Sequence, residues 1–268
     1  MNLREFVLKA IEEDAPFGDI TSEVFKGREI KAVILAKGEG VFCGDGVLRE
    51  FERVFNFTVK SVSDGFGFKY GDVLAEIKGD AYDILLCERT VLNIISKLSG
   101  IATLTKRFVE LAGDVPIYDT RKTTPLMRFL EKYAVRVGGG YNHRLTLSEI
   151  VMVKDNHKRI AGGIKRAVEM IRERFGRHVY IEVEVENLEE LNEALECGVD
   201  WVLLDNMDIG TLREAINMAK GKVKVEVSGG VSLENVKEIA SLKPDRISVG
   251  AITKAAKPID MSLEVVEW

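Results

Sequence analysis

The sequence predicts an α/β protein whose two halves have different architectures, and three observations carry this prediction. The first half sets short apolar runs between closely spaced glycines, as antiparallel strands joined by tight turns do. The second half alternates β-rich runs with amphipathic helical segments, which is typical of a parallel sheet. The chain has 268 residues, 46% hydrophobic and 30% charged, which is enough for one large domain or two modest ones.

In the first half, apolar residues at helical spacing predict a helix over residues 3–13. From residue 30 to residue 77 we expect antiparallel strands and turns throughout. The expected strands lie at residues 32–36, 57–62 and 73–77. A long helix is expected over residues 81–111, with an interruption near Ser99 and Gly100.

In the second half, the strands are expected at residues 117–122, 150–156, 180–187, 201–206, 223–230 and 246–251. The helices between them are expected at residues 163–174, 188–197, 209–219 and 233–242. This regular alternation favours closure of the parallel sheet into a barrel. In such barrels the chemistry lies at the carboxyl ends of the strands, so we expect the polar residues found there to form one site.

Composition excludes several classes of protein. A net charge of -5 argues against a general nucleic-acid binder, which needs a basic surface. Cys43, Cys87 and Cys197 are scattered and form no CxxC pair, so neither a disulfide framework nor a zinc site is expected. The first residues lack a signal-peptide pattern and no apolar run approaches membrane length, from which we expect a cytoplasmic protein. No Walker motif, GxGxxG, nucleophile elbow or HExxH occurs.

Glycines end the last two predicted strands. Ser228, Gly229 and Gly230 follow one strand and Gly250 follows the next. Barrels often bind a phosphate at this corner, because bare backbone amides suit an anion. Ordinary tight turns are the alternative interpretation, and the pairing of two such ends favours phosphate.

Two carboxylates, Glu184 and Asp205, end neighbouring predicted strands. Oxygen ligands from separate strands suit a Mg²⁺ ion that also holds substrate phosphates. The alternative is a pair of solvated charges, or partners for nearby basic side chains.

A basic set is the most informative feature. It comprises Arg89, Arg121, Lys122, His143, Arg144 and Lys154. Arginine binds carboxylate and phosphate in a bidentate manner. Lys154 ends an apolar strand, so it needs an anion there, or a lowered pKa and a chemical task. His157 and His178 are expected to be structural or exposed.

Several motifs, in family order over nearly the whole chain, resemble those of the quinolinate phosphoribosyltransferase family. They are EDAPFGDIT at 13–21, ERTVLN at 88–93, SGIAT at 99–103, DTRKTTP at 119–125, EKYAVRVGGGYNHR at 131–144, VKDNH at 153–157, VEVENLEEL at 183–191, LLDN at 203–206, VSGGV at 227–231 and ISVG at 247–250. Two segments depart from the family pattern. TPLMR at 124–128 stands where the family has TPGLR, and HRLTLSE at 143–149 where it has HRLGLxD.

The resemblance implies an N-terminal α/β sandwich domain over residues 1–105, joined by the tail 255–268, and an incomplete α/β barrel over residues 106–254. It implies transfer of the phosphoribosyl group of PRPP to quinolinate with decarboxylation, giving nicotinate mononucleotide, CO₂ and pyrophosphate in NAD biosynthesis. Mg²⁺ is the implied cofactor. The implied assembly is a homodimer in which Arg89 reaches the partner's site, with a hexamer as the alternative.

The resemblance also implies roles for the residues. Quinolinate would be bound by Arg89, Arg121, His143, Arg144 and Lys154, and Lys122 would bind either quinolinate or the PRPP diphosphate. Glu184 and Asp205 would bind Mg²⁺ and the ribose hydroxyls, while Ser228, Gly229, Gly230 and Gly250 would bind the 5′-phosphate. Lys122, Lys154, Glu184 and Asp205 would be the catalytic set.

Three alternatives stay open. The first is a paralogue of the same fold that is associated with molybdenum transport. The second is a barrel aldolase with Lys154 as a Schiff-base nucleophile, against which the surrounding Arg and His residues argue. The third is a non-catalytic phosphosugar-binding protein, which would need neither the paired carboxylates nor a dicarboxylate site.

Overall fold

The computed structural model describes residues 2–268 and divides into two compact units. Unit 1 contains residues 2–104, 125–139 and 256–268, and unit 2 contains residues 105–124 and 140–255. The sequence-based boundaries placed residues 125–139 with the barrel, whereas their contacts lie within unit 1.

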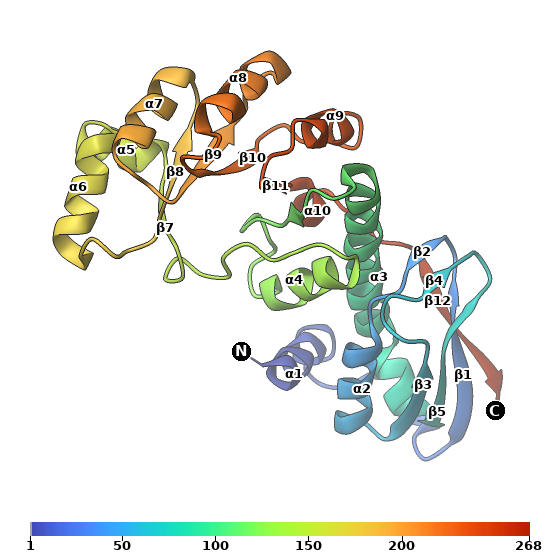
Figure 1. Cartoon of the computed structure of the whole chain (residues 1–268). Helices are drawn as coiled ribbons and strands as arrows, with labels where there is room; N and C mark the ends of the chain where they lie inside the picture. The colour runs from blue at the N-terminus through green and yellow to red at the C-terminus, as the bar shows by residue number, and fades with distance from the viewer. Residues whose placement is uncertain (1) are drawn as a thin grey trace. The chain divides into compact units, whose positions relative to one another are not determined.

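Unit 1 is built on a four-stranded antiparallel sheet in the order β12-β1-β5-β3. The strands are β1 (Glu29–Ala36), β3 (Phe57–Ser61), β5 (Val73–Asp80) and β12 (Met261–Glu267), and a small pair joins β2 (Gly40–Val41) to β4 (Gly67–Phe68). The C-terminal β12 pairs with β1, so the red end of the chain lies beside a blue strand (Figure 1). Burial alternates along β1, because one face of the sheet packs on the core.

The helices of unit 1 are α1 (Leu3–Asp14), α2 (Asp45–Val54), α3 (Ala81–Ala112) and α4 (Arg128–Val137), with a 3₁₀ turn at Ser22–Phe25. The prediction of strands and turns over residues 30–77 was wrong at α2. There Val47, Leu48 and Phe51 recur at helical spacing and are buried on one face. Gly44 and Gly46, at the start of the helix, hid this periodicity.

Helix α3 is continuous, so the predicted interruption near Ser99 and Gly100 was wrong. A side chain at Gly100 would place its Cβ 2.1 Å from the carbonyl oxygen of Lys257. Glycine is therefore needed there for the close approach of another chain segment, and not to break the helix. Residues 105–112 of α3 belong to unit 2.

Unit 2 contains six parallel strands in the order β6-β11-β10-β9-β8-β7. They are β6 (Ile117–Tyr118), β7 (Val151–Val153), β8 (Ile181–Val185), β9 (Trp201–Asp205), β10 (Lys224–Ser228) and β11 (Arg246–Ser248). The strands follow their sequence order around the sheet, but β6 and β7 are not paired in residues 2–268. The parallel sheet is thus an incomplete barrel, as predicted.

The helices of unit 2 are α5 (Asp155–Ala161), α6 (Ile164–Phe175), α7 (Leu188–Glu196), α8 (Ile209–Ala219), α9 (Val236–Ser241) and α10 (Ala251–Lys254). Asn187 and Asp208 cap α7 and α8, and their side-chain oxygens accept hydrogen bonds from first-turn amides. The ends of β8 and β9 are therefore each followed by a helix with a capped first turn. Within residues 2–268, no helix combines the length and apolarity needed to span a bilayer.

Candidate active site

A pocket of about 430 Å³ opens at the carboxyl ends of the strands of unit 2. Eight of the twelve predicted binding residues line it. They are Arg121, Lys122, His143, Arg144, Lys154, Glu184, Asp205 and Ser228. The position agrees with the rule that barrels place chemistry at this end. The pocket is therefore lined by both basic side chains and carboxylates.

The basic side chains come from three segments. Arg121 and Lys122 follow β6, Arg144 lies in the loop before β7, and Lys154 follows β7. Nη1 of Arg144 donates to the carbonyl oxygen of Ile150 at 3.1 Å, which fixes the side chain within its own loop. Burial and the neighbouring Arg121 charge lower the pKa of Arg144. Two cations held this close favour an anion between them.

The carboxylates Glu184 and Asp205 end the adjacent strands β8 and β9. Nζ of Lys154 contacts Oε2 of Glu184 directly. Burial and the charge of Glu184 raise the pKa of Asp205, so a further cation beside it would be favourable. Nδ2 of Asn206 donates to Asp205 at 2.6 Å. Two hard oxygen donors on neighbouring strands fit a Mg²⁺ ion.

His143 is buried, with only 8% of its surface exposed. Its Nε2 lies 3.2 Å from Oε2 of Glu226 and 3.5 Å from Oε2 of Glu182. Its backbone N–H donates to Oδ1 of Asp119 at 2.9 Å. The buried Asp119 therefore holds the loop and is not a free acid of the site.

The glycine corner has the backbone that the sequence suggested. Gly229 and Gly230 have φ values of 83° and 61°, which favour glycine. A Cβ at Gly229 would lie 2.5 Å from the backbone nitrogen of Asn206. Within residues 2–268, no protein group accepts a hydrogen bond from the amides of Gly229 or Gly230. Bare amides beside the pocket-lining Ser228 suit an oxyanion.

Arg89, the remaining member of the basic set, lies in unit 1 on α3 and is exposed. Sequence reasoning missed Glu226 and Ser248, which line the pocket, and Glu182 and Arg246 below them. The signal was present, because each of Glu182, Glu226 and Arg246 stands two residues before a pocket residue on its strand.

Both departures from the family pattern lie in loops or at a helix start. Glu149 accepts from the Leu145 amide at 2.7 Å and from the hydroxyl of Thr146 at 3.3 Å, which closes the HRLTLSE loop. Leu126, which replaces the family's glycine, has a φ of 65°. A leucine in this left-handed conformation is strained.

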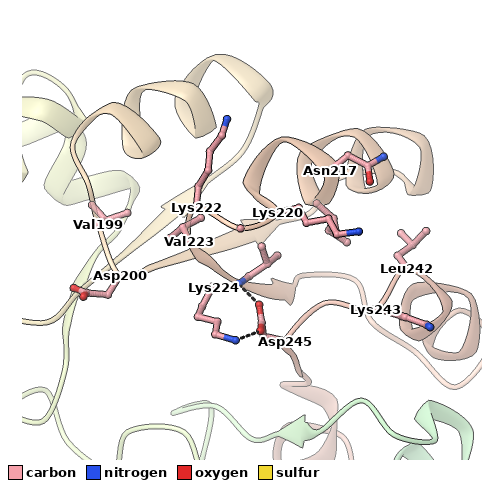
Figure 2. A pocket seen from close by; sticks show the side chains of 13 residues that line it. Val199, Asp200, Asn217, Lys220, Lys222, Val223, Lys224, Leu242, Lys243 and Asp245 are labelled. Atoms are coloured by element: carbon pink, nitrogen blue, oxygen red, sulfur yellow. Dashed lines mark hydrogen bonds and ion pairs between the residues drawn. The ribbon is translucent and has the colours of Figure 1, made fainter.

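A larger pocket of about 750 Å³ lies at the other ends of the strands (Figure 2). Figure 2 shows Asp245 accepting from Nζ of Lys224, at 2.6 Å, and from the Val225 amide, at 2.8 Å. Its other labelled basic residues are Lys220, Lys222 and Lys243, all exposed. It lacks the converging Arg and His side chains of the pocket at the carboxyl ends, which we call the mouth pocket, so the mouth pocket is the candidate active site.

Comparison with known proteins covers both units. The models of the quinolinate phosphoribosyl transferase N-terminal and C-terminal domains match residues 19–99 and 101–264. A "Probable nicotinate-nucleotide pyrophosphorylase [carboxylating]" of Bacillus subtilis is 40% identical, over 99% of this chain and 94% of that protein. The mitochondrial "Quinolinate phosphoribosyltransferase [decarboxylating] 2" of Nicotiana glauca is 35% identical, over 98% and 82%. The crystal structure of nicotinate-nucleotide pyrophosphorylase from Ehrlichia chaffeensis superimposes with a TM-score of 0.95 at 34% identity, covering 99% of each chain.

Proposed function

The chain belongs to the quinolinate phosphoribosyltransferase family, and from this premise we propose how its own residues perform the family's reaction. The activity is transfer of the phosphoribosyl group of PRPP to quinolinate with decarboxylation, a step of NAD biosynthesis. The products are nicotinate mononucleotide, CO₂ and pyrophosphate. We assign this chemistry to side chains of the mouth pocket.

Quinolinate carries two carboxylates, and Arg121, Arg144 and Lys154 bind them in this proposal. The support is that these three cations line one pocket from three different segments. Arginine forks match the planar carboxylate in two parallel hydrogen bonds, and lysine adds a point charge. Holding both carboxylates also orients the ring nitrogen for attack on the ribose.

PRPP lies across the opposite wall of the pocket in this proposal. The amides after Ser228, at Gly229 and Gly230, donate to its 5′-phosphate, and Gly250 lets the chain pass close to it. A Cβ at Gly250 would lie 3.0 Å from Cδ of Lys122, so the glycine keeps room for that lysine. Lys122, exposed at the rim, binds the diphosphate. Its charge then opposes the negative charge that grows on the leaving group.

Glu184 and Asp205 would hold Mg²⁺. When bound there, the ion neutralises diphosphate charge and orients the ribose for displacement. Lys154, which contacts Glu184 in the structure, would then turn its charge toward a quinolinate carboxylate. The carboxylates of Glu184 and Asp205 also lie where positive charge develops on the sugar, and they stabilise it.

The reaction needs no covalent intermediate with the protein. The quinolinate ring nitrogen attacks C1 of the ribose as the bond to pyrophosphate breaks. The N-alkylated ring is then cationic and accepts the electron pair of the adjacent C–CO₂ bond, so CO₂ departs. The carbon that loses CO₂ takes up a proton. The pocket residues orient the two reactants and exclude water while these bonds change.

We further propose that the chain acts as a homodimer and that Arg89 completes the partner's pocket. Arg89 is exposed on α3, with 65% of its side chain accessible, and its nearest carboxylate, on Glu88, is 4.0 Å away. An arginine held this loosely is available to a second subunit. A hexamer remains the alternative assembly, and a cytoplasmic location remains a prediction.

One observation carries the proposal: the cations Arg121, Lys122, Arg144 and Lys154 and the carboxylates Glu184 and Asp205 line one pocket, and two left-handed glycines follow its Ser228. The test is a steady-state assay of purified protein with PRPP, Mg²⁺ and quinolinate, in which nicotinate mononucleotide and CO₂ are measured. Arg144→Ala should raise the KM for quinolinate at least tenfold. Unchanged kinetics in a folded Arg144→Ala protein would contradict the assignment of the site.

A further inference from the structure

Three charged side chains lie at and below the base of the mouth pocket and take no part in the proposed chemistry. We call Glu182, Glu226 and Arg246 the floor cluster. Their exposed fractions are 0%, 1% and 8%. They come from β8, β10 and β11, and each points into the barrel one layer beneath the residues that meet substrate. Burying three charges is costly, so such a cluster requires a role that offsets the cost.

The floor cluster is closely paired. Nη2 of Arg246 donates to Oε1 of Glu182 at 2.8 Å, and its Nε donates to Glu226. The guanidinium also lies 3.8 Å from the ring centroid of Trp201, in cation–π contact. The planar guanidinium of Arg246 is thereby held at its face by Trp201 and at its edge by the two glutamates. The Oε2 atoms of Glu182 and Glu226 face the ring of His143.

His143 links the floor cluster to the loop that carries Arg144. Its Nδ1 accepts a hydrogen bond from the Arg144 amide at 2.7 Å. Its Nε2 lies 3.0 Å from Nη2 of Arg246 and 3.2 Å from Glu226. A ring that accepted at both nitrogens would carry no proton, so Nε2 holds the proton and donates it to Glu226.

The charge state of His143 does not change this bond. Burial would lower the pKa of His143, but hydrogen bonds with Glu182 and Glu226 outweigh burial and raise it to about 9. The hydrogen bond from the Arg144 amide belongs to the neutral ring only, because that amide needs a lone pair on Nδ1. In both the neutral and the charged ring, Nε2 carries a proton. The link from ring to floor is common to both states.

The same loop is held from a second direction. Asp119 accepts from the backbone N–H of His143, at 2.9 Å, and from Nδ2 of Asn142, at 2.6 Å. The backbone is thus fixed by Asp119 and the ring is fixed by the floor cluster. The next residue is Arg144, whose guanidinium enters the pocket. Small rotations of the His143 ring would therefore displace the Arg144 backbone.

The arrangement also resembles a metal site, because ligand atoms of His143, Glu182 and Glu226 lie within 4.8 Å of one another. Arg246 argues against that interpretation. Its guanidinium already contacts both carboxylates, so the cation of the cluster is the arginine. The geometry favours a positioning role over a second metal.

We propose that the floor cluster positions the quinolinate site: Glu226 and Glu182, tied by Arg246, hold the His143 ring and thereby the backbone of the adjacent Arg144. The inference rests on the proposed function only in taking quinolinate as the dicarboxylate bound by Arg144. His143 is then a link between floor and loop. Glu182, Glu226 and Arg246 are positioning residues for substrate affinity.

Glu226→Gln gives a test in which the sign of the effect decides. Glu226 lines the pocket, and removing a negative charge there should by charge alone improve binding of a dianion. The positioning role predicts the opposite, a KM for quinolinate raised at least tenfold. The KM for PRPP and kcat should stay within threefold. The exposed Glu214→Gln is the matched control, since it makes the same change of charge and should leave all three constants unaltered.

A double-mutant cycle tests whether Glu226 acts through His143. In a His143→Leu background, adding Glu226→Gln should raise the KM for quinolinate less than twofold further. His143→Gln keeps an N–H donor at the Nε2 position and should recover at least threefold of the affinity lost in His143→Leu. Full additivity, or equal loss in both His143 variants, would overturn the proposal.

Arg246→Lys is a second test of the floor cluster, for use if the Glu226→Gln protein fails to fold. It keeps the cation but loses the paired donors, so a smaller rise in the KM for quinolinate is expected, in the same direction. The two proposals fail differently. Absence of product from the wild-type protein would sink the proposed function. A wild type that turns over, with a Glu226→Gln or Arg246→Lys variant of unchanged or lower KM for quinolinate, would sink the floor-cluster inference.

Discussion

Replacing Gly229 by alanine is the perturbation whose effect the structure specifies most fully. The φ of 83° costs an L-residue about 1–2 kcal/mol. The new Cβ would also lie 2.5 Å from the backbone nitrogen and from Oδ1 of Asn206. Because Asn206 is itself left-handed, with a φ of 54°, its backbone has little freedom to move away. Overpacking of this kind costs about 1–3 kcal/mol.

Gly221→Ala is the matched control. Gly221 has a φ of 75°, close to that of Gly229, and a Cβ added there would meet no atom within 4 Å. Both variants share the conformational cost and the loss of unfolded-state freedom. The difference in unfolding free energy between them, measured by urea denaturation, should therefore be about 1–3 kcal/mol.

The functional part of the prediction is that Gly229→Ala displaces the amides that bind the 5′-phosphate. The KM for PRPP should rise at least tenfold, which corresponds to about 1.4 kcal/mol of lost binding. The KM for quinolinate should stay within threefold, and Gly221→Ala should change neither. A folded Gly229→Ala protein with wild-type affinity for PRPP would refute the assignment of the Gly229 and Gly230 amides to the 5′-phosphate.

Three further changes have expected outcomes. Leu126→Gly should be more stable to urea than Leu126→Ala by about 1 kcal/mol, because only glycine relieves the left-handed φ of 65° at this exposed position; equal stabilities would contradict the strain. The pKa of His143, raised from 6.5 to about 9, stabilises the fold fully below pH 6.5, and this contribution is lost as the pH rises through about 9. Urea midpoints of wild type and His143→Gln at several pH values should show a slope that the variant lacks, and parallel curves would contradict it. Glu184→Gln should raise the Mg²⁺ concentration for half-maximal activity at least tenfold, and an unchanged Mg²⁺ dependence would remove Glu184 from the metal site.

The parallel half of the fold could be predicted from sequence because its signals are local. The strands of unit 2 are short β-rich runs that alternate with amphipathic segments, and the predicted helix at 209–219 coincides with α8. The antiparallel half was harder. Helix α2 was missed because glycines stand at the start of a short apolar periodicity. Gly100 was taken for a break although its role is set by Lys257, far along the chain.

The site divides in the same way. Residues at strand ends, such as Lys154 and Glu184, follow from the rule on where barrels place chemistry, and the structure brings them together in one pocket. The positions of charged residues within strands could not be predicted from that rule. Glu182 and Arg246 are placed in the barrel interior by the period of two, but their mutual contacts depend on the closure of β8, β10 and β11 around them. Pairing across non-adjacent strands has no local signature.

The most direct test of the central claim is product formation from quinolinate, with nicotinate as the parallel substrate. Purified protein with PRPP and Mg²⁺ should release nicotinate mononucleotide and CO₂ in equal amounts from quinolinate, and no product from nicotinate, since the cationic pocket is built for two carboxylates. EDTA should abolish the reaction. A folded protein that makes the mononucleotide from nicotinate, or from neither acid, would contradict the account.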